Sequence, residues 1–305
     1  MGWLRTHIAL LLLVGLASPH TRLPGPQHVV VLVLENTNWS SLAGNLREDV
    51  FLNTVLLPQA SYALRYYNPP DVHPSLPNYL WLQGGQCYTY CGSEAPPTQP
   101  ITSSAHLTAQ LDAAGLSWGA YLETAPPGIC PTRDWARYYA VRHNPFVYFS
   151  DVVRDPAYCV AHIHPYSALP GAVTWGTLPR YVFLVPNLCG DGHSACPPYN
   201  DPLLQEDVWL RRQLAPLLHD MVVRDESTVF VTWDEGEGGD GPIGLLVFSA
   251  FAKGHGYHNA IPYTHSSLLR TVEELLGVPP LGAAAQANDL GDLFRTWPLA
   301  PVPRP

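Results

Sequence analysis

The chain has 305 residues, of which 47% are hydrophobic and 13% are charged. This length and composition suit one large globular domain or two small ones, and they exclude a disordered chain. The formal charge of −9, with Lys253 as the only lysine, argues against a nucleic-acid-binding surface, because such surfaces carry clusters of basic residues.

Residues 1–17 have the pattern of a secretory signal peptide. Arg5 gives a basic start, an apolar run follows, and the small residues Gly15 and Ala17 stand where cleavage would occur. An uncleaved membrane anchor is the alternative, although the run is short for a transmembrane helix. Residues 18–27 then form a linker, and no later stretch is apolar for long enough to cross a bilayer. We therefore expect an exported protein, either secreted, periplasmic or at the cell surface.

Export bears on the six cysteines, because an even number in an exported chain favours disulfides over a zinc site. No Cys-x-x-Cys is present, which weakens the zinc and redox interpretations further. Pairing in sequence order joins Cys87 to Cys91, Cys130 to Cys159 and Cys189 to Cys196. Six cysteines allow many other pairings, so this connectivity stays a hypothesis.

Apolar runs rich in β-branched residues predict buried strands, and apolar residues at helical spacing predict helices. The strands are expected at 28–34, 118–123, 180–187, 227–236 and 242–250. Helices are expected from Ser75 onward and at 103–115, 201–221 and 268–276, with Pro216 kinking or ending the one at 201–221. Much of 84–179 is dense in Pro, Tyr, His and Cys, and we expect it to form an irregular, disulfide-tied rim of a pocket.

The alternation of strands and helices indicates a single α/β domain over residues 28–296. The expected architecture is a three-layer α/β/α sandwich with a mostly parallel central sheet. Residues 297–305 follow as a proline-rich tail. In such a sheet the carboxyl ends of the strands share one edge, which is where ligands bind.

Polar side chains follow three of the predicted strands at that edge. Glu35 and Asn36 come after the first strand, Asp191 and His193 shortly after the third, and Asp234 and Glu235 end the strand at 227–236; we expect all six to meet at one site. Such a group of hard oxygen ligands suits one divalent ion, Ca²⁺, Mg²⁺ or Mn²⁺. Taken singly, each could instead be an ordinary turn or strand-terminal residue.

Ser75 stands where a helix can begin, which allows two interpretations. Its hydroxyl could be an N-cap, or it could be a nucleophile at a helix N-terminus, where amide donors favour an alkoxide and a phosphate. His143, His162 and His164 lie in the irregular region with no acid nearby in the sequence, so surface or packing roles are expected for them rather than metal binding.

Five motifs occur in order along the chain: Val-Leu-Glu-Asn, His-Pro-Ser-Leu-Pro-Asn-Tyr, Asn-x-x-x-Asp-Gly-His, Trp-Asp-Glu-Gly and Tyr-Thr-His-Ser-Ser. Together they resemble the bacterial phosphoesterase family, which unites acid phosphatases and nonspecific phospholipases C within the alkaline phosphatase superfamily. The resemblance covers residues 28–277 and is greatest to secreted acid phosphatases, including those that act on phosphatidylinositol 3-phosphate. Five co-ordered motifs are far more specific than any single one.

The resemblance implies a role for each matching residue. The divalent ion would be bound by Glu35, Asn36, Asp234 and Glu235. Ser75 would attack phosphorus, His193 would protonate the leaving oxygen, and the phosphate pocket would be lined by Asp191, His73, Asn78 and His265. The implied protein is an exported bacterial acid phosphatase that hydrolyses a small phosphomonoester or a phosphoinositide through a phosphoserine. Alternatives are a phospholipase C or phosphodiesterase on the same site and, more remotely, a non-catalytic binding module.

Overall fold

The computed structural model describes residues 25–303, so the predicted signal peptide lies outside the described residues. Its centre is an eight-stranded sheet in which seven strands run in one direction and β8 runs in the other. Across the sheet the order is β5 (Ile163–Pro165), β4 (Trp118–Leu122), β6 (Tyr181–Val185), β1 (His28–Leu34), β7 (Ser227–Trp233), β8 (Leu245–Phe248), β2 (Ser61–Ala63) and β9 (Tyr257–Asn259). A separate pair joins β3 (Tyr66–Tyr67) to β10 (Tyr263–Thr264).

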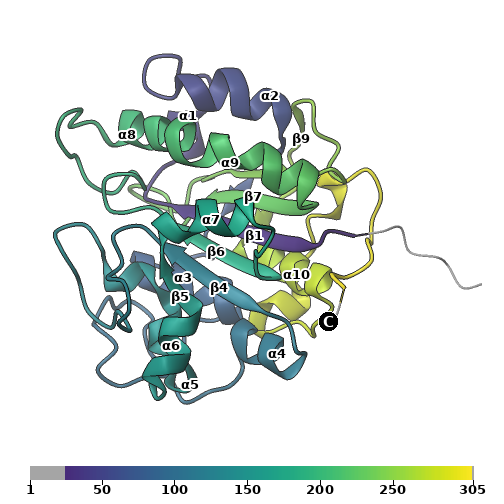
Figure 1. The fold of residues 1–305 in the computed structure, drawn as a ribbon. Coiled ribbons are helices and arrows are strands. Elements are labelled where there is room, and N and C mark those ends of the chain that lie inside the picture. Colours follow the sequence, from purple (N-terminus) through teal and green to yellow (C-terminus); the bar gives the residue numbers. More distant parts are fainter. Residues whose placement is uncertain (1–24, 304–305) are drawn as a thin grey trace, which may run out of the picture.

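Helices cover both faces of this sheet (Figure 1). One face carries α3 (Ser75–Gly84), α4 (Leu107–Ala113) and α10 (His265–Leu276). The other carries α1 (Trp39–Leu42), α2 (Leu57–Gln59), α8 (Pro202–Trp209) and α9 (Ala215–His219). The short helices α5 (Ser150–Val153) and α6 (Pro156–His162) lie toward the β5 edge, whereas α7 (Leu169–Thr174) lies on the α9 side and contacts the turn Asp220–Arg224. The predicted α/β/α sandwich with a mostly parallel sheet is therefore confirmed.

The two longest strands, β1 and β7, are adjacent and in register, with Leu34 opposite Trp233. All of β7 is buried, and β1 is buried from Val29 onward, as expected for central strands covered on both faces. Their apolar side chains form the middle of the core. The register matters for function, because Glu35 and Asp234 directly follow this last pair at the same edge of the sheet.

Some element predictions were wrong in ways that have local causes. The helix predicted to kink or stop at Pro216 continues to Arg224, because Pro216 lies in the first turn of α9, just after the π-helical turn Leu210–Leu214, which absorbs the change in hydrogen bonding. The last helix begins three residues early, at His265, because Thr264 and Ser267 form a capping box.

The region 84–179 is less irregular than predicted, since α5, α6, α7 and β5 lie within it. Each of these elements has seven residues or fewer, too few for a hydrophobic period to appear. The three disulfides pair as hypothesised, Cys87–Cys91, Cys130–Cys159 and Cys189–Cys196, which indicates folding in an oxidising compartment. Within residues 25–303 no helix combines the length and apolar character needed to cross a membrane.

Candidate active site

Three neighbouring strands, β6, β1 and β7, bring the polar strand ends together. The backbone N–H of Glu35 donates to the carbonyl oxygen of Asp191 at 2.8 Å, and that of Asp234 donates to the carbonyl of Leu34 at 2.9 Å. The loop after β6 and the ends of β1 and β7 are thus joined by main-chain hydrogen bonds. The carboxylates that follow these strands share one edge of the sheet, as the parallel topology requires.

Glu35 is fully buried, and side chains of α3 converge on it. Ser75 Oγ donates to Glu35 Oε2 at 3.1 Å, and the Tyr79 hydroxyl, one turn later, donates to Glu35 Oε1 at 2.7 Å. Ser75 is the first residue of α3, but Pro74 occupies the N-cap position and makes no side-chain cap. The N-cap interpretation of Ser75 is therefore wrong, and its hydroxyl is directed at a carboxylate instead.

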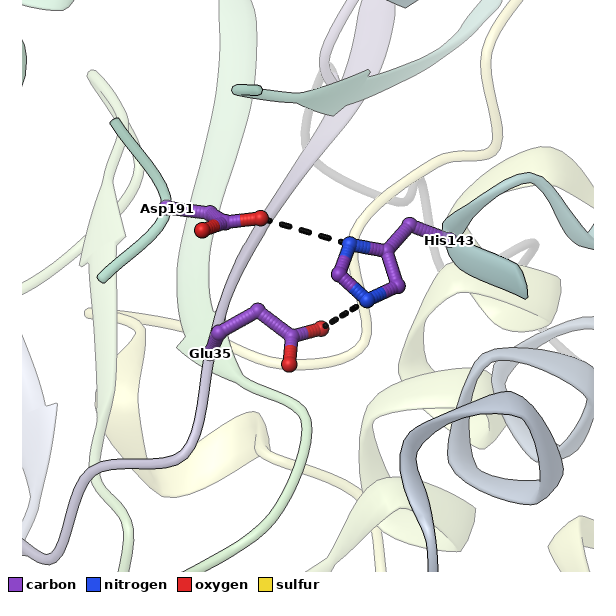
Figure 2. Close-up of side chains that lie close together, drawn as sticks. All are labelled: Glu35, His143 and Asp191. Carbon is purple, nitrogen blue, oxygen red and sulfur yellow. Dashed lines mark ion pairs between the residues drawn. The ribbon is translucent and has the colours of Figure 1, made fainter. Parts of the chain in front are cut away.

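His143 lies between Glu35 and Asp191, as Figure 2 shows. Its Nε2 is 3.2 Å from Glu35 Oε1 and its Nδ1 is 3.3 Å from Asp191 Oδ2. Its ring stacks on that of Tyr79, with centroids 5.1 Å apart. The potential ligand atoms of Glu35, His143 and Asp191 all lie within 4.8 Å of one another, so this buried group could hold a metal ion.

The expectation that His143 has no acid partner is thus wrong. Sequence reasoning missed it because its partners are distant in the chain, and no spacing signal could have revealed them. The other two histidines of that region do have packing roles. The ring of His162 stacks on Trp118, with centroids 4.5 Å apart, and His164 packs against Tyr121.

The end of β7 forms the other side of the site. Asp234 Oδ1 accepts hydrogen bonds from the backbone N–H of Asn36 at 3.1 Å and of Glu235 at 2.7 Å. Glu235 Oε2 accepts from Asn78 Nδ2 at 3.2 Å and lies 2.5 Å from His73 Nδ1. Of the predicted ligands, Glu35, Asp234 and Glu235 therefore surround Ser75 and α3, whereas the contact made by Asn36 is through its backbone.

Burial raises the pKa of three carboxyl groups here, Glu35, Asp191 and Asp234, the last to about 7, and the charges of neighbouring carboxylates add to the effect. A buried group of acids is costly unless a cation neutralises it. Several buried polar atoms have no hydrogen-bond partner: Asn78 Oδ1, His143 Nε2, Asp191 Oδ2 and Asp234 Oδ2. This donor set, mostly oxygen with one imidazole, fits a divalent ion.

His193 lies on the loop after β6 that the Cys189–Cys196 disulfide closes. Its backbone N–H donates to Asp191 Oδ1 at 2.8 Å, and its Nε2 accepts a hydrogen bond from Arg142 Nη2 at 3.1 Å. Burial, with the charge of Arg142 adding to it, lowers the pKa of His193. The guanidinium of Arg142 therefore holds the His193 imidazole beside Asp191, and the lowered pKa favours release of a proton from its protonated form.

His265 is buried behind the end of β7. Its Nδ1 is 2.9 Å from the Tyr66 hydroxyl and its Nε2 is 2.5 Å from the carbonyl oxygen of Asp234. Burial lowers its pKa to about 4, so the ring is neutral at physiological pH. Both ring nitrogens are occupied by protein groups. The structure thus places His265 against the backbone of Asp234.

The fold is similar to that of a solved protein of the alkaline phosphatase superfamily. A protein of that superfamily from Vibrio parahaemolyticus superposes with a TM-score of 0.59 at 11% identity, over 88% of this chain and 70% of that one. A phosphonate monoester hydrolase from Silicibacter pomeroyi gives 0.57 at 12% identity, over 89% and 77%. At such identities the likeness concerns the fold alone.

The sequence shows the family to which the chain belongs. The model of the Phosphoesterase family matches residues 60–279, so the chain belongs to this family, and the predicted class of enzyme, a hydrolase of phosphate esters, is confirmed. A phosphatidylinositol-3-phosphatase of Mycobacterium tuberculosis is 30% identical over 284 residues, 92% of this chain and 86% of that enzyme. A probable acid phosphatase of Kluyveromyces lactis is 29% identical over 265 residues, but these cover only 58% of the yeast enzyme.

Proposed function

We propose that this protein is an exported, metal-dependent acid phosphatase that hydrolyses phosphomonoesters with Ser75 as nucleophile. The observation that carries the proposal is the 3.1 Å hydrogen bond from Ser75, at the N-terminus of α3, to the buried carboxylate of Glu35. Amide donors at a helix N-terminus also favour a bound phosphate. Relatives named as a phosphatidylinositol-3-phosphatase and an acid phosphatase support the phosphomonoester as substrate.

The proposed location is outside the cytoplasm of a bacterium, in the periplasm, at the cell surface or secreted. Three disulfides support export, because they persist in oxidising compartments. The predicted signal peptide at 1–17 supports it independently. A phosphatase in such a compartment would meet extracellular phosphate esters, small ones or the headgroups of phosphoinositides.

The divalent ion would be held at the strand ends, by the predicted ligands Glu35, Asn36, Asp234 and Glu235. On the other side of Glu35, His143 and Asp191 are further candidate ligands. When bound, a Ca²⁺, Mg²⁺ or Mn²⁺ ion supplies positive charge that favours the ionised form of the Ser75 hydroxyl.

In the first step, Ser75 Oγ forms a bond to phosphorus while the bond from phosphorus to the leaving oxygen breaks. The hydroxyl proton passes along the existing hydrogen bond to Glu35 Oε2, and the leaving oxygen takes a proton from the imidazolium form of His193, which becomes neutral. In the second step, water attacks the phosphoserine and gives a proton to His193. The bond from phosphorus to Oγ then breaks, and Oγ regains its proton from Glu35.

The remaining predicted residues, His73, Asn78 and His265, differ in whether they can contact a bound phosphate. The His73 side chain is 38% exposed, so it can contact a bound phosphate directly while it holds Glu235. Asn78 is fully buried, and its amide Nδ2 is shared between Glu235 and backbone carbonyls. For His265 we propose a positioning role, because both of its nitrogens are engaged and one of them holds the carbonyl of Asp234.

The test uses mature residues 18–305 with p-nitrophenyl phosphate and its bis ester, from acidic to mildly alkaline pH, with and without EDTA. We expect turnover of the monoester that is lost in EDTA and in Ser75→Ala. Ser150→Ala is the matched control, because Ser150 is also the first residue of a helix, α5, and it should retain turnover. Preference for the bis ester would indicate a phosphodiesterase or phospholipase C. No turnover of either ester, with metal still bound, would contradict an enzyme and favour a binding module.

A further inference from the structure

A cavity of about 330 Å³, open to solvent, is lined by Arg142, which contacts His193 of the candidate active site. Its lining includes Trp135, Arg137, Tyr139 and Arg142 from one loop and Leu188 from the loop after β6. The mechanism above uses none of the first three. Trp135 is 44% exposed and forms part of the wall of the cavity.

Two contacts join this cavity to the reaction centre. Arg142, which lines the cavity, donates from Nη2 to His193 Nε2 at 3.1 Å, and His193 is the acid proposed for the leaving oxygen. The backbone N–H of Leu188 donates to the carbonyl of Tyr138 at 3.0 Å, which ties the lining loop to the loop that carries Asp191 and His193. A leaving group that extends past His193 would therefore enter this cavity.

The lining carries two arginines, Arg137 and Arg142, and one acid, Asp134, in a chain whose formal charge is −9. The Asp134 carboxylate accepts the backbone N–H of Val141 at 2.9 Å. The charge of Arg142 is partly neutralised by an ion pair, since its Nε lies 3.3 Å from Glu94 Oε1. Arg137 lies over the ring of Tyr138, 5.4 Å from its centroid, and within residues 25–303 it has no ion pair. It is the cation available to a ligand.

We propose that this cavity is a leaving-group subsite that selects phosphomonoesters whose leaving group is a ring with a second anionic substituent. The exposed ring of Trp135 offers apolar surface, the buried Tyr139 forms part of the wall behind it, and Arg137 offers the charge. The inference rests on the proposed phosphatase function and adds a substrate class to it. Because Arg137 is exposed, its attraction for the anion should be moderate and should weaken with added salt.

The test compares two esters that differ in one charge, m-carboxyphenyl phosphate and m-carbamoylphenyl phosphate, at low ionic strength. We expect wild-type kcat/KM to favour the carboxylate ester by about three- to tenfold. Arg137→Gln should bring the ratio of the two kcat/KM values close to one, and Arg137→Lys should keep most of the preference. Arg133→Gln is the matched control, since Arg133 is exposed in the same loop but does not line the cavity, and it should leave the ratio unchanged.

Calorimetric binding of both esters to Ser75→Ala separates the proposed subsite from the proposed phosphatase function. If wild type hydrolyses both esters with equal kcat/KM, or if Arg137→Gln and Arg133→Gln shift the ratio alike, the subsite is overturned while the phosphatase stands. If wild type hydrolyses neither ester, the phosphatase function fails. The binding preference of Ser75→Ala, and its loss when Arg137→Gln is added, then decides the subsite alone.

Discussion

Glu35 is the residue on which the candidate site depends most. Its carboxylate is fully buried and is approached by a hydroxyl from Ser75, a phenol from Tyr79 and an imidazole from His143. Each of these groups restricts where the two oxygens can lie. A ligand carboxylate held in this way is prepared for a metal ion, because orienting contacts to ligands strengthen metal binding.

Tyr79→Phe tests this orientation. The change removes the hydroxyl that donates to Glu35 Oε1 and leaves the ring, and we expect metal affinity, measured by isothermal titration, to fall by about 10- to 100-fold. Tyr181→Phe is the control, because its buried hydroxyl accepts a hydrogen bond from Gln83 instead. Equal affinities in the two variants would show that the Tyr79 hydroxyl does not orient a metal ligand.

Sequence alone could predict those site residues that follow long apolar strands. Glu35 and Asp234 are of this kind, because the end of a buried strand is visible in the sequence and the topology of a parallel sheet places such ends together. His143 could not be predicted, because a short 3₁₀ helix and folding of the rim bring it to the site. Arg142 was missed for the same reason.

Among the elements, the loop between β6 and α8 is constrained by two glycines and a disulfide. A Cβ on Gly190 would lie 2.4 Å from Trp209 Cδ1, and Gly192 has φ +93°, a conformation that favours glycine. The disulfide Cys189–Cys196 closes the same loop. These constraints fix Asp191 and His193 relative to β1.

Replacing Cys189 and Cys196 together by serine should therefore affect catalysis more than stability. We expect kcat/KM for p-nitrophenyl phosphate to fall by at least about tenfold, because small displacements of reacting groups are costly. Replacing Cys87 and Cys91 is the control, since that disulfide also closes a short loop. If both double variants lose activity only in proportion to their loss of folded protein, the loop disulfide has no specific role.

The helical segment that includes α2 begins with an unusual arrangement of acids. Asp207 from α8 accepts the backbone N–H groups of Phe51 and Leu52, at 3.1 and 2.8 Å. Asp49, which precedes them, is buried with no hydrogen-bond partner for either carboxylate oxygen. Burial, with repulsion from Asp207 adding to it, raises the pKa of Asp49 to about 8.

Because of this raised pKa, the free energy of unfolding should depend on pH in a known direction. Between the ordinary value of 3.8 and about 8, the folded protein holds a proton on Asp49 that the unfolded chain has lost, so the free energy of unfolding falls as pH rises through that window. In urea titrations, Asp49→Asn should lose less of this free energy between pH 5 and 8 than wild type, by at least about 1 kcal/mol. Asp155→Asn, at the exposed cap of α6, is the control. A wild-type-like slope in Asp49→Asn would contradict the assignment.

At the scale of the whole molecule, the sequence predicted the layer order and the parallel sheet because its central strands are long and apolar. It did not predict the short elements at the β5 edge, whose positions depend on tertiary contacts and on the Cys130–Cys159 disulfide. The edge of the sheet that carries the candidate site is thus built from strands that the sequence predicts. The rim above it is built from short elements that the sequence does not predict. The subsite that we propose for the leaving group lies in that rim, and so its prediction required the structure.

Metal binding should also stabilise the folded protein as a whole. Buried carboxylates from three strand ends repel one another, so an ion that binds only the folded state should stabilise it. We expect EDTA to lower the melting temperature of wild type by about 5–10 °C. Glu35→Gln should melt at the same temperature with and without EDTA. An EDTA-insensitive wild type would contradict a metal site at this edge.

The most direct test of the central claim is to trap the covalent intermediate. Wild-type protein is mixed with p-nitrophenyl phosphate in the steady state, quenched in acid, digested and analysed by mass spectrometry. We expect one phosphoryl group on Ser75, absent without substrate and absent in Ser75→Ala. A phosphoryl group on another residue, or rapid turnover with Ser75 unmodified in both the steady state and the pre-steady-state burst, would contradict Ser75 as the nucleophile.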